Sequence, residues 1–147
     1  TVLVGILGDF MSENYLCFFA KALLNGQFRC KSAESFHIAE RHGIQCSDEE
    51  NHQQCETLAN LLHEQSRFAL GVTQLPQQAT NNMELRVQCG GILGIQRSLS
   101  AEAEASSDIP TLIRQAILTF ERIEKFPYPM IMQSVSQWKP HRRHRRR

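Results

Sequence analysis

The segment from Ile109 to Ile123 carries the strongest amphipathic pattern in the chain, and it constrains the fold more than any other stretch. Its apolar residues recur at the three- and four-residue spacing that places side chains on one face of a helix. They are Ile109, Leu112, Ile113, Ala116, Ile117, Phe120 and Ile123. Asp108 or Ser107 is suited to cap this helix, and Pro110 suits its first turn. An apolar face of this kind needs a partner, so we predict a helix that packs on a sheet.

A second helix is predicted from Ser47 to about Gln65. Ser47 lies three residues before Glu50, which is the spacing of a capping box, and the acidic first turn suits the helix dipole. The apolar stripe of this helix consists of Cys55, Leu58, Ala59 and Leu62. Two further helices are predicted over residues 14–24 and 32–42, because each is followed by a glycine that can end it.

Strands are predicted where apolar residues run together or alternate with polar ones. These segments are residues 2–8, 27–31, 68–75, 83–89 and 92–99. Gly90-Gly91 offers a tight turn between the last two, which predicts an antiparallel hairpin. The order of elements predicts an α/β or α+β layered sandwich, a mixed sheet of about four to five strands flanked by helices.

The chain of 147 residues has the length of one domain. We predict a single α/β domain over residues 1–126, followed by an extended arm and a basic tail over residues 127–147. Pro127 and Pro129 are expected to end the last helix of the domain. The arm could fold back on its own domain or dock on a neighbouring subunit. The candidate docking residues are Tyr128, Met130, Ile131 and Trp138.

Charge is distributed unevenly along the chain. Of the 16 Lys and Arg residues, five lie in the last seven positions, whereas all 15 Asp and Glu residues come earlier. With Lys139 also set aside, ten basic and 15 acidic side chains remain in residues 1–138, a net charge of −5. A dense cluster of guanidinium groups binds phosphate or another multiply charged anion, so RNA is an expected partner. The candidate anion-binding or nucleic-acid-binding residues are Arg142, Arg143, Arg145, Arg146 and Arg147.

The remaining composition bears on location. No apolar run approaches the roughly 18 residues that a membrane-spanning helix requires. The five cysteines are odd in number and include no Cys-x-x-Cys pair, which favours free thiols in an intracellular, reducing compartment. The chain begins with Thr1, which a cleaved mitochondrial targeting peptide would explain, as would a boundary within a longer chain.

We predict no catalytic residue, no metal site and no cofactor from motifs. Gly5-Ile6-Leu7-Gly8 lacks both the third glycine of a dinucleotide fingerprint and the Gly-Lys-Ser/Thr ending of a P-loop. His52 and Cys55 have a spacing that zinc sites use, but Cys55 belongs to an apolar stripe, while His52 and His63 look solvated. Asp9, directly after the first predicted strand, is the best-placed carboxylate for a ligand pocket.

Residues 40–126 resemble the C-terminal half of the CinA C-terminal domain, the nicotinamide-nucleotide amidase family. The segment from His42 to Glu49 is similar to the family's helix entry, and Leu70 to Pro76 is similar to its Thr-Gly-Ile-Ala-Gly-Pro strand. A strand pair and a closing amphipathic helix from Glu84 to Lys125 follow the family's order. The family's Glu-Ser-Cys-Thr-Gly-Gly segment, which supplies its nucleophilic serine, is absent, because Phe36-His37 follow Ala33-Glu34-Ser35 here. The resemblance therefore implies a relative without the catalytic centre.

These patterns favour a non-catalytic structural or adaptor subunit of a larger assembly, such as a ribonucleoprotein or organellar complex, anchored by the arginine tail. Its expected partners are other protein subunits, and RNA through the tail. Two alternatives stay open. One is a small amidohydrolase of the amidase type named above, and the other is a regulatory module that binds a ligand near Asp9.

Overall fold

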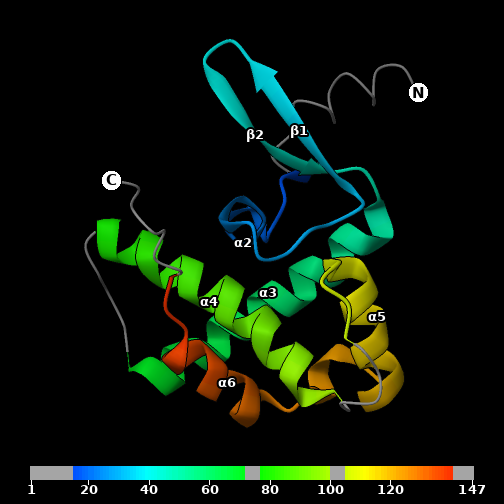
Figure 1. The fold of residues 1–147 in the computed structure, drawn as a ribbon, viewed down its shortest axis with the longest axis vertical. Coiled ribbons are helices and arrows are strands. Elements are labelled where there is room, and N and C mark those ends of the chain that lie inside the picture. Colours follow the sequence, from blue (N-terminus) through cyan, green and yellow to red (C-terminus); the bar gives the residue numbers. More distant parts are fainter. Residues whose placement is uncertain (1–14, 72–76, 100–104, 141–147) are drawn as a thin grey trace, which may run out of the picture.

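A computed structural model of the chain describes residues 15–71, 77–99 and 105–140, and the following account concerns these residues. They form five α-helices, a short 3₁₀ helix and a two-stranded hairpin (Figure 1). In chain order these are α2 (Ala20–Asn25), β1 (Ala33–Ile38), β2 (Arg41–Cys46), α3 (Glu49–Leu70), α4 (Gln77–Ser98), α5 (Ile109–Phe120), η2 (Ile123–Lys125) and α6 (Tyr128–Gln137). The helices pack into one body, and the hairpin extends away from it.

The predicted layered sandwich with a mixed sheet of four to five strands is wrong. Residues 83–89 and 92–99, predicted as a hairpin, belong to the single helix α4. The predicted helix over residues 32–42 is instead β1, the turn and the start of β2. Helix α3 continues to Leu70, inside the segment predicted as a strand over residues 68–75. The predicted strand over residues 2–8 lies outside the described residues.

Helix α4 is the centre of the body and is surrounded on most sides. All residues from Val87 to Ile92 are buried, as are Gly94 and Ile95. A helix segment enclosed in this way has no solvent-facing stripe, so residues 87–95 lack the spacing of apolar and polar residues that marks a half-exposed helix. In residues 83–89 apolar and polar residues alternate one by one, which is the pattern of a half-exposed strand, and this pattern produced the wrong prediction.

Helices α4 and α6 cross in opposite directions at very short range. Gly90 lies against Val135 and Ser134, whereas Gly94, one turn later, lies against Ile131. A Cβ atom added to Gly90 would lie 2.6 Å from Val135 Cα, and one added to Gly94 would lie 2.8 Å from Ile131 Cα. Neither distance accommodates a carbon atom, so the two glycines permit the backbones to approach closely.

The predicted extended arm is wrong, because residues 128–137 form helix α6 and pack in the core. Ile131 and Val135 are completely buried, and Tyr128 and Trp138 are nearly so. The Tyr128 hydroxyl donates a hydrogen bond to the Ile123 carbonyl at 2.7 Å. Trp138 Nε1 donates to Gln27 Oε1 at 3.2 Å, which joins segments 111 residues apart. The boundary predicted at residue 126 thus falls inside one packed unit.

The two best-supported helices of the sequence are confirmed as α3 and α5. Asp48, rather than Ser47, caps α3 by accepting from the Asn51 amide at 2.9 Å. Asp108 caps α5 by accepting from the Thr111 amide and hydroxyl. Each helix buries one apolar face, but α5 packs on helices rather than on a sheet. The main core is built from Leu58 and Leu62 of α3, Val87, Ile92 and Ile95 of α4, Ile109, Leu112, Ile113 and Ala116 of α5, and Ile131 and Val135 of α6.

The hairpin is held to the body only at its base, as far as the described residues show. Leu16 pairs with Gln45, and the Cys17 amide donates to the Ile44 carbonyl at 3.0 Å. On the other strand, Ser47 donates from both its amide and its hydroxyl to the Ser32 carbonyl. These bonds fix the inner end of the hairpin and leave its outer end free of the helices (Figure 1).

The predicted edge strand over residues 27–31 is reduced to one parallel bridge between Arg29 and Asp108. The Arg29 amide donates to the Ser107 carbonyl, and the Ile109 amide donates to the Arg29 carbonyl. Asp108 also accepts from the Lys31 amide at 2.8 Å. This one carboxylate therefore caps α5 and attaches the segment before the hairpin to the helical body.

Candidate functional site

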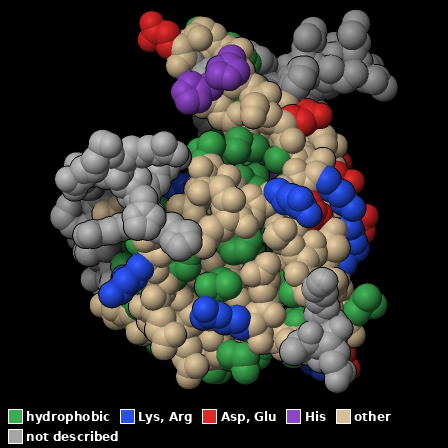
Figure 2. Space-filling model, in the orientation of Figure 1, with side chains coloured by type: hydrophobic (Ala, Val, Ile, Leu, Met, Phe, Trp, Pro, Cys, Tyr) green, Lys and Arg blue, Asp and Glu red, His purple; other side chains and the backbone are tan. Residues whose placement is uncertain are grey.

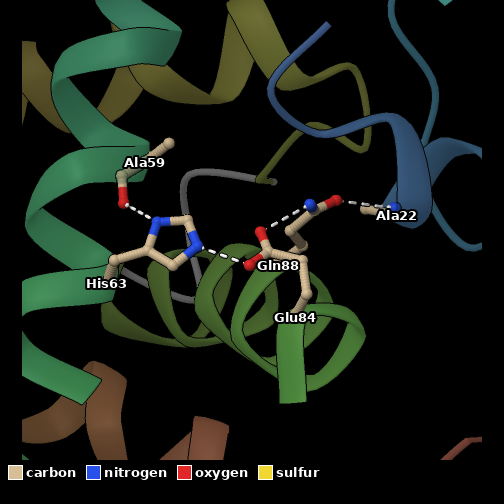
Figure 3. Close-up of polar contacts among 5 residues, drawn as sticks. All are labelled: Ala22, Ala59, His63, Glu84 and Gln88. Atoms are coloured by element: carbon tan, nitrogen blue, oxygen red, sulfur yellow. Dashed lines mark hydrogen bonds and ion pairs between the residues drawn. The ribbon is translucent and has the colours of Figure 1, made fainter. Parts of the chain in front are cut away.

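A chain of polar contacts links three helices around His63 (Figure 3). His63 Nε2 lies 2.6 Å from Glu84 Oε1, and His63 Nδ1 lies 2.6 Å from the Ala59 carbonyl of the preceding turn. The other oxygen of Glu84 accepts from Gln88 Nε2 at 2.8 Å. Gln88 Oε1 in turn accepts from the Ala22 amide, near the start of α2, at 3.0 Å. The contacts run from α3 through α4 to α2.

The geometry selects the charged form of His63. Both ring nitrogens face oxygen acceptors, so both must donate, and only the imidazolium ion carries two N–H groups. The hydrogen bond to Glu84 raises the pKa of His63 above its ordinary value, more than burial and the nearby Arg67 lower it. Burial acts to raise the pKa of Glu84, but hydrogen bonds from His63 and Gln88 and the charge of Lys21 outweigh it and lower that pKa.

This cluster positions helices rather than reacting with a substrate. Both nitrogens of His63 are engaged, so neither is free to accept a proton from a substrate. Gln88 is almost fully buried between Glu84 and the α2 backbone and thereby orders the short helix α2. His63, predicted to be solvated, lies instead in a half-buried ion pair with Glu84.

The outer end of the hairpin carries a pair of histidines. His37 and His42 face one another across the two strands, and their ring centres lie 5.3 Å apart. Both side chains are exposed and lie side by side on the projecting end of the molecule (Figure 2, purple). The helix predicted over residues 32–42 places these two histidines on a helix surface and hides their pairing, which depends on strand register.

The opposite face of the hairpin carries two large apolar side chains of β1, together with the exposed Glu34. Phe36 packs on Gly43, where an added Cβ would lie 3.0 Å from the phenyl ring. Phe36 and Ile38 are two residues apart on this face, and both are half-buried. An aromatic ring over a cross-strand glycine stabilises a hairpin whose sheet, in the described part of the chain, consists of two strands.

A shallow groove of about 380 Å³ runs between α3, the end of α5 and η2. Three carboxylates line it, those of Glu50, Glu121 and Glu124, together with the Arg122 guanidinium. The groove is open to solvent. It offers a weakly acidic surface rather than a site for chemistry.

All five cysteines are free thiols. Burial raises the pKa of Cys17 to about 11 and that of Cys89 to about 11, and it raises the pKa of Cys55 further. A thiol acts as a nucleophile only as the thiolate, so these groups are poorly reactive at neutral pH. Within the described ranges, no group of three or more metal-ligating side chains converges. Nor does any helix in those ranges have the length and apolar character to cross a membrane.

His52 is placed differently from the expectation of a solvated side chain. It is buried, its Nε2 lies 3.0 Å from the Leu16 carbonyl, and it packs against Tyr15 and Phe18. His52 therefore fixes the segment before α2 against the first turn of α3. Cys55 lies one turn further along α3 and packs against the core, as its apolar spacing predicted.

The predicted docking residues are not brought together on a surface. Tyr128, Ile131 and Trp138 are buried within their own chain, whereas Met130 remains 47% exposed. The three buried side chains thus support the core in this conformation and are not exposed anchors. The five arginines of the tail and Asp9 lie outside the described residues.

Comparison with known proteins found no matching family model, no matching curated protein and no matching solved structure. The strand pair that the amidase resemblance implied after Glu84 is part of helix α4.

Proposed function

We propose that this chain is a non-catalytic adaptor or structural subunit that contacts a neighbouring protein through its β1–β2 hairpin. The observation that carries the proposal is the isolation of the outer hairpin from the helical body. An unsupported two-stranded hairpin is marginally stable in water and adds little to the stability of a domain. Its projection is therefore better explained by contact with another molecule than by a contribution to this fold.

The surface chemistry of the hairpin supports the same function. Phe36 and Ile38 are partly exposed, and among the described residues no strand pairs with the edge of β1 that faces away from β2. Exposed strand edges accept an added strand from a partner through main-chain hydrogen bonds, and the side chains beside them give the contact its specificity. A partner that adds a strand to β1 would cover both features at once.

The arginine tail forms the second part of this proposal and rests on sequence alone. Five guanidinium groups within residues 142–147 suit an anionic surface such as RNA phosphate. Deletion of residues 141–147 should then reduce RNA affinity and flatten its dependence on salt. Unchanged RNA affinity after the deletion would remove the tail from the proposal and leave the hairpin contact untouched.

A photo-crosslinking comparison tests the hairpin contact. A photoreactive phenylalanine analogue is placed at Phe36 in one sample and at Phe68 in another. Phe68 is a suitable control because it is 87% exposed on the helical body. The proposal expects one discrete adduct from position 36 and none of the same size from position 68.

A second variant tests whether the adduct depends on the apolar face. Ile38→Asp, made in the chain with the analogue at position 36, should abolish the adduct without changing the melting temperature of the body. Equal adducts from both positions, or an adduct that survives Ile38→Asp, would contradict a specific hairpin contact.

A further inference from the structure

We propose that His37 and His42 form a two-imidazole binding site for a divalent transition-metal ion of the zinc and nickel group. The two residues are direct partners in the antiparallel register, His37 on β1 and His42 on β2. Cross-strand partners bring their Cβ atoms within about 5.5 Å, which is close enough for two side chains to hold one ion. This site does not depend on the protein contact proposed above.

The ring separation fits one shared ion. Two imidazoles bound to a tetrahedral ion through metal–nitrogen bonds of about 2.05 Å have ring centres about 5.2 Å apart. The observed separation of 5.3 Å agrees with this value. The planes are inclined by 30°, and rotation about the side-chain torsions can direct one nitrogen of each ring at a common point.

The described surroundings leave both rings available. Both side chains are exposed, and no hydrogen bond to either ring occurs among the described residues. This differs from His52 and His63, whose ring nitrogens bond to backbone or carboxylate oxygens. His37 and His42 are therefore the histidines of the described chain whose nitrogens are free to bind a metal ion.

The ion would stiffen the hairpin and keep open positions. Two protein ligands satisfy half of a tetrahedral shell, so water or a ligand from another molecule completes it. An ion bound by both strands links them next to the turn, where only Ala39 and Glu40 join the strands. Metal binding should therefore suppress opening of the outer hairpin.

Zinc titration of the full chain, followed by NMR of the histidine rings, tests the site. One equivalent of Zn²⁺ should shift the ring signals of His37 and His42 together, with those of His63 unchanged. Amide hydrogen exchange in residues 35–44 should slow on zinc addition, with no change in α4. Co²⁺ then reports the ligands, since its absorption spectrum distinguishes imidazole from thiolate coordination.

Matched variants distinguish metal binding at His37 and His42 from metal binding at other side chains of the chain. His37→Ala and His42→Ala should each lower the affinity at least about tenfold, because chelation places the second imidazole at high effective concentration. His141→Ala combined with His144→Ala should leave it unchanged. A double variant, Ser35→His with His37→Ser, keeps the number of histidines but moves one of them to a position diagonal to His42. The Cα atoms of the pair are then about 7–8 Å apart, so binding should weaken.

Two results would overturn the proposal. One is an affinity that neither His37→Ala nor His42→Ala reduces, and the other is a Co²⁺ spectrum dominated by thiolate coordination. Because these measurements use the isolated chain and added metal, they can succeed or fail independently of the crosslinking experiment at Phe36.

Discussion

The α4–α6 crossing and the β1–β2 hairpin are stabilised in opposite ways. At the crossing, backbone lies against backbone, and the space around Gly90 and Gly94 is filled by α6. The hairpin depends on its own strand pairing and on Phe36 over Gly43, with attachment to the body only at its base among the described residues. The crossing tolerates almost no added volume, whereas the hairpin can change its surface without cost to the core. This division suits a rigid body that presents a variable contact element.

The largest effect is expected from Gly94→Ala and Gly90→Ala. The added methyl would lie 2.8 Å and 2.6 Å from backbone atoms of α6, which cannot move without displacing the whole helix. We expect a loss of about 3 kcal/mol or more in the free energy of unfolding, at the upper end of overpacking effects. Urea unfolding monitored by circular dichroism measures this loss.

Gly91→Ala is the matched control on the same helix. Its methyl would lie 2.8 Å from Leu62 Cδ1, the end of a buried side chain that can adjust more easily than the backbone of α6. Alanine also has a higher helix propensity, by about 1 kcal/mol, which offsets part of the strain. A Gly94→Ala protein as stable as the Gly91→Ala protein would show that the close crossing is not present.

Tyr128→Phe should have the next largest effect. The hydroxyl of this buried side chain is hydrogen-bonded to the Ile123 carbonyl at 2.7 Å, and its removal leaves that carbonyl without this donor. We expect a loss of about 1–2 kcal/mol. Thermal unfolding by calorimetry provides the measurement, and an unchanged melting temperature would argue against the buried start of α6.

Phe36→Ala should barely change global stability, by less than about 1 kcal/mol, because its ring covers one glycine at the edge of the molecule. Amide exchange should instead accelerate locally in β1 and β2, because the outer hairpin opens without the body. A comparable acceleration in α4 would contradict the energetic independence of the hairpin.

The smallest effect concerns pH and the His63–Glu84 pair. The pKa of His63 is raised from 6.5 in the folded state. The stabilisation of the folded chain by the charged ring is therefore complete below pH 6.5 and is lost as the pH rises through the raised pKa. The pKa of Glu84 is lowered from 4.5 in the folded state. The stabilisation of the folded chain by the carboxylate is therefore complete above pH 4.5 and is lost as the pH falls through the lowered pKa. The pair should therefore stabilise most between pH 4.5 and 6.5.

His63→Gln provides the comparison for this pH dependence. The difference in unfolding free energy between the native and variant chains should be under about 1 kcal/mol, because solvent screens a pair that is 38% and 26% exposed. It should shrink on both sides of the window from pH 4.5 to 6.5. A difference that grows above that window would reverse the assigned protonation of His63.

The sequence could predict α3 and α5 because each has one buried face and an acidic cap. It could not predict α4, because that helix is buried on most sides and its glycines imitate a turn. The informative signal was the four-residue spacing of Gly90 and Gly94, which places both glycines on one helix face. Pro127 and Pro129 could be interpreted in two ways. A proline after one helix can begin an extended segment, or it can occupy the first turn of a further helix, as it does in α6.

The candidate sites depend on pairings that composition does not reveal. Ala39 and Glu40 form the hairpin turn without glycine or asparagine, and Ala39 adopts a φ of 54° that its side chain disfavours. The usual turn signal is thus missing, which also concealed the His37–His42 pair. His63 and Glu84 lie 21 residues apart and meet only because α3 packs on α4.

The packing of α6 on α4, together with the hydrogen bond from Trp138 to Gln27, affects the order in which the chain can fold. Because α6 fills the glycine face of α4, the central helix has no complete environment until the chain has been synthesised through that region. Early folding would leave α4 with an uncovered apolar groove, and contacts between such distant segments form slowly. A nascent chain at this stage is the form most prone to aggregate or to need a chaperone.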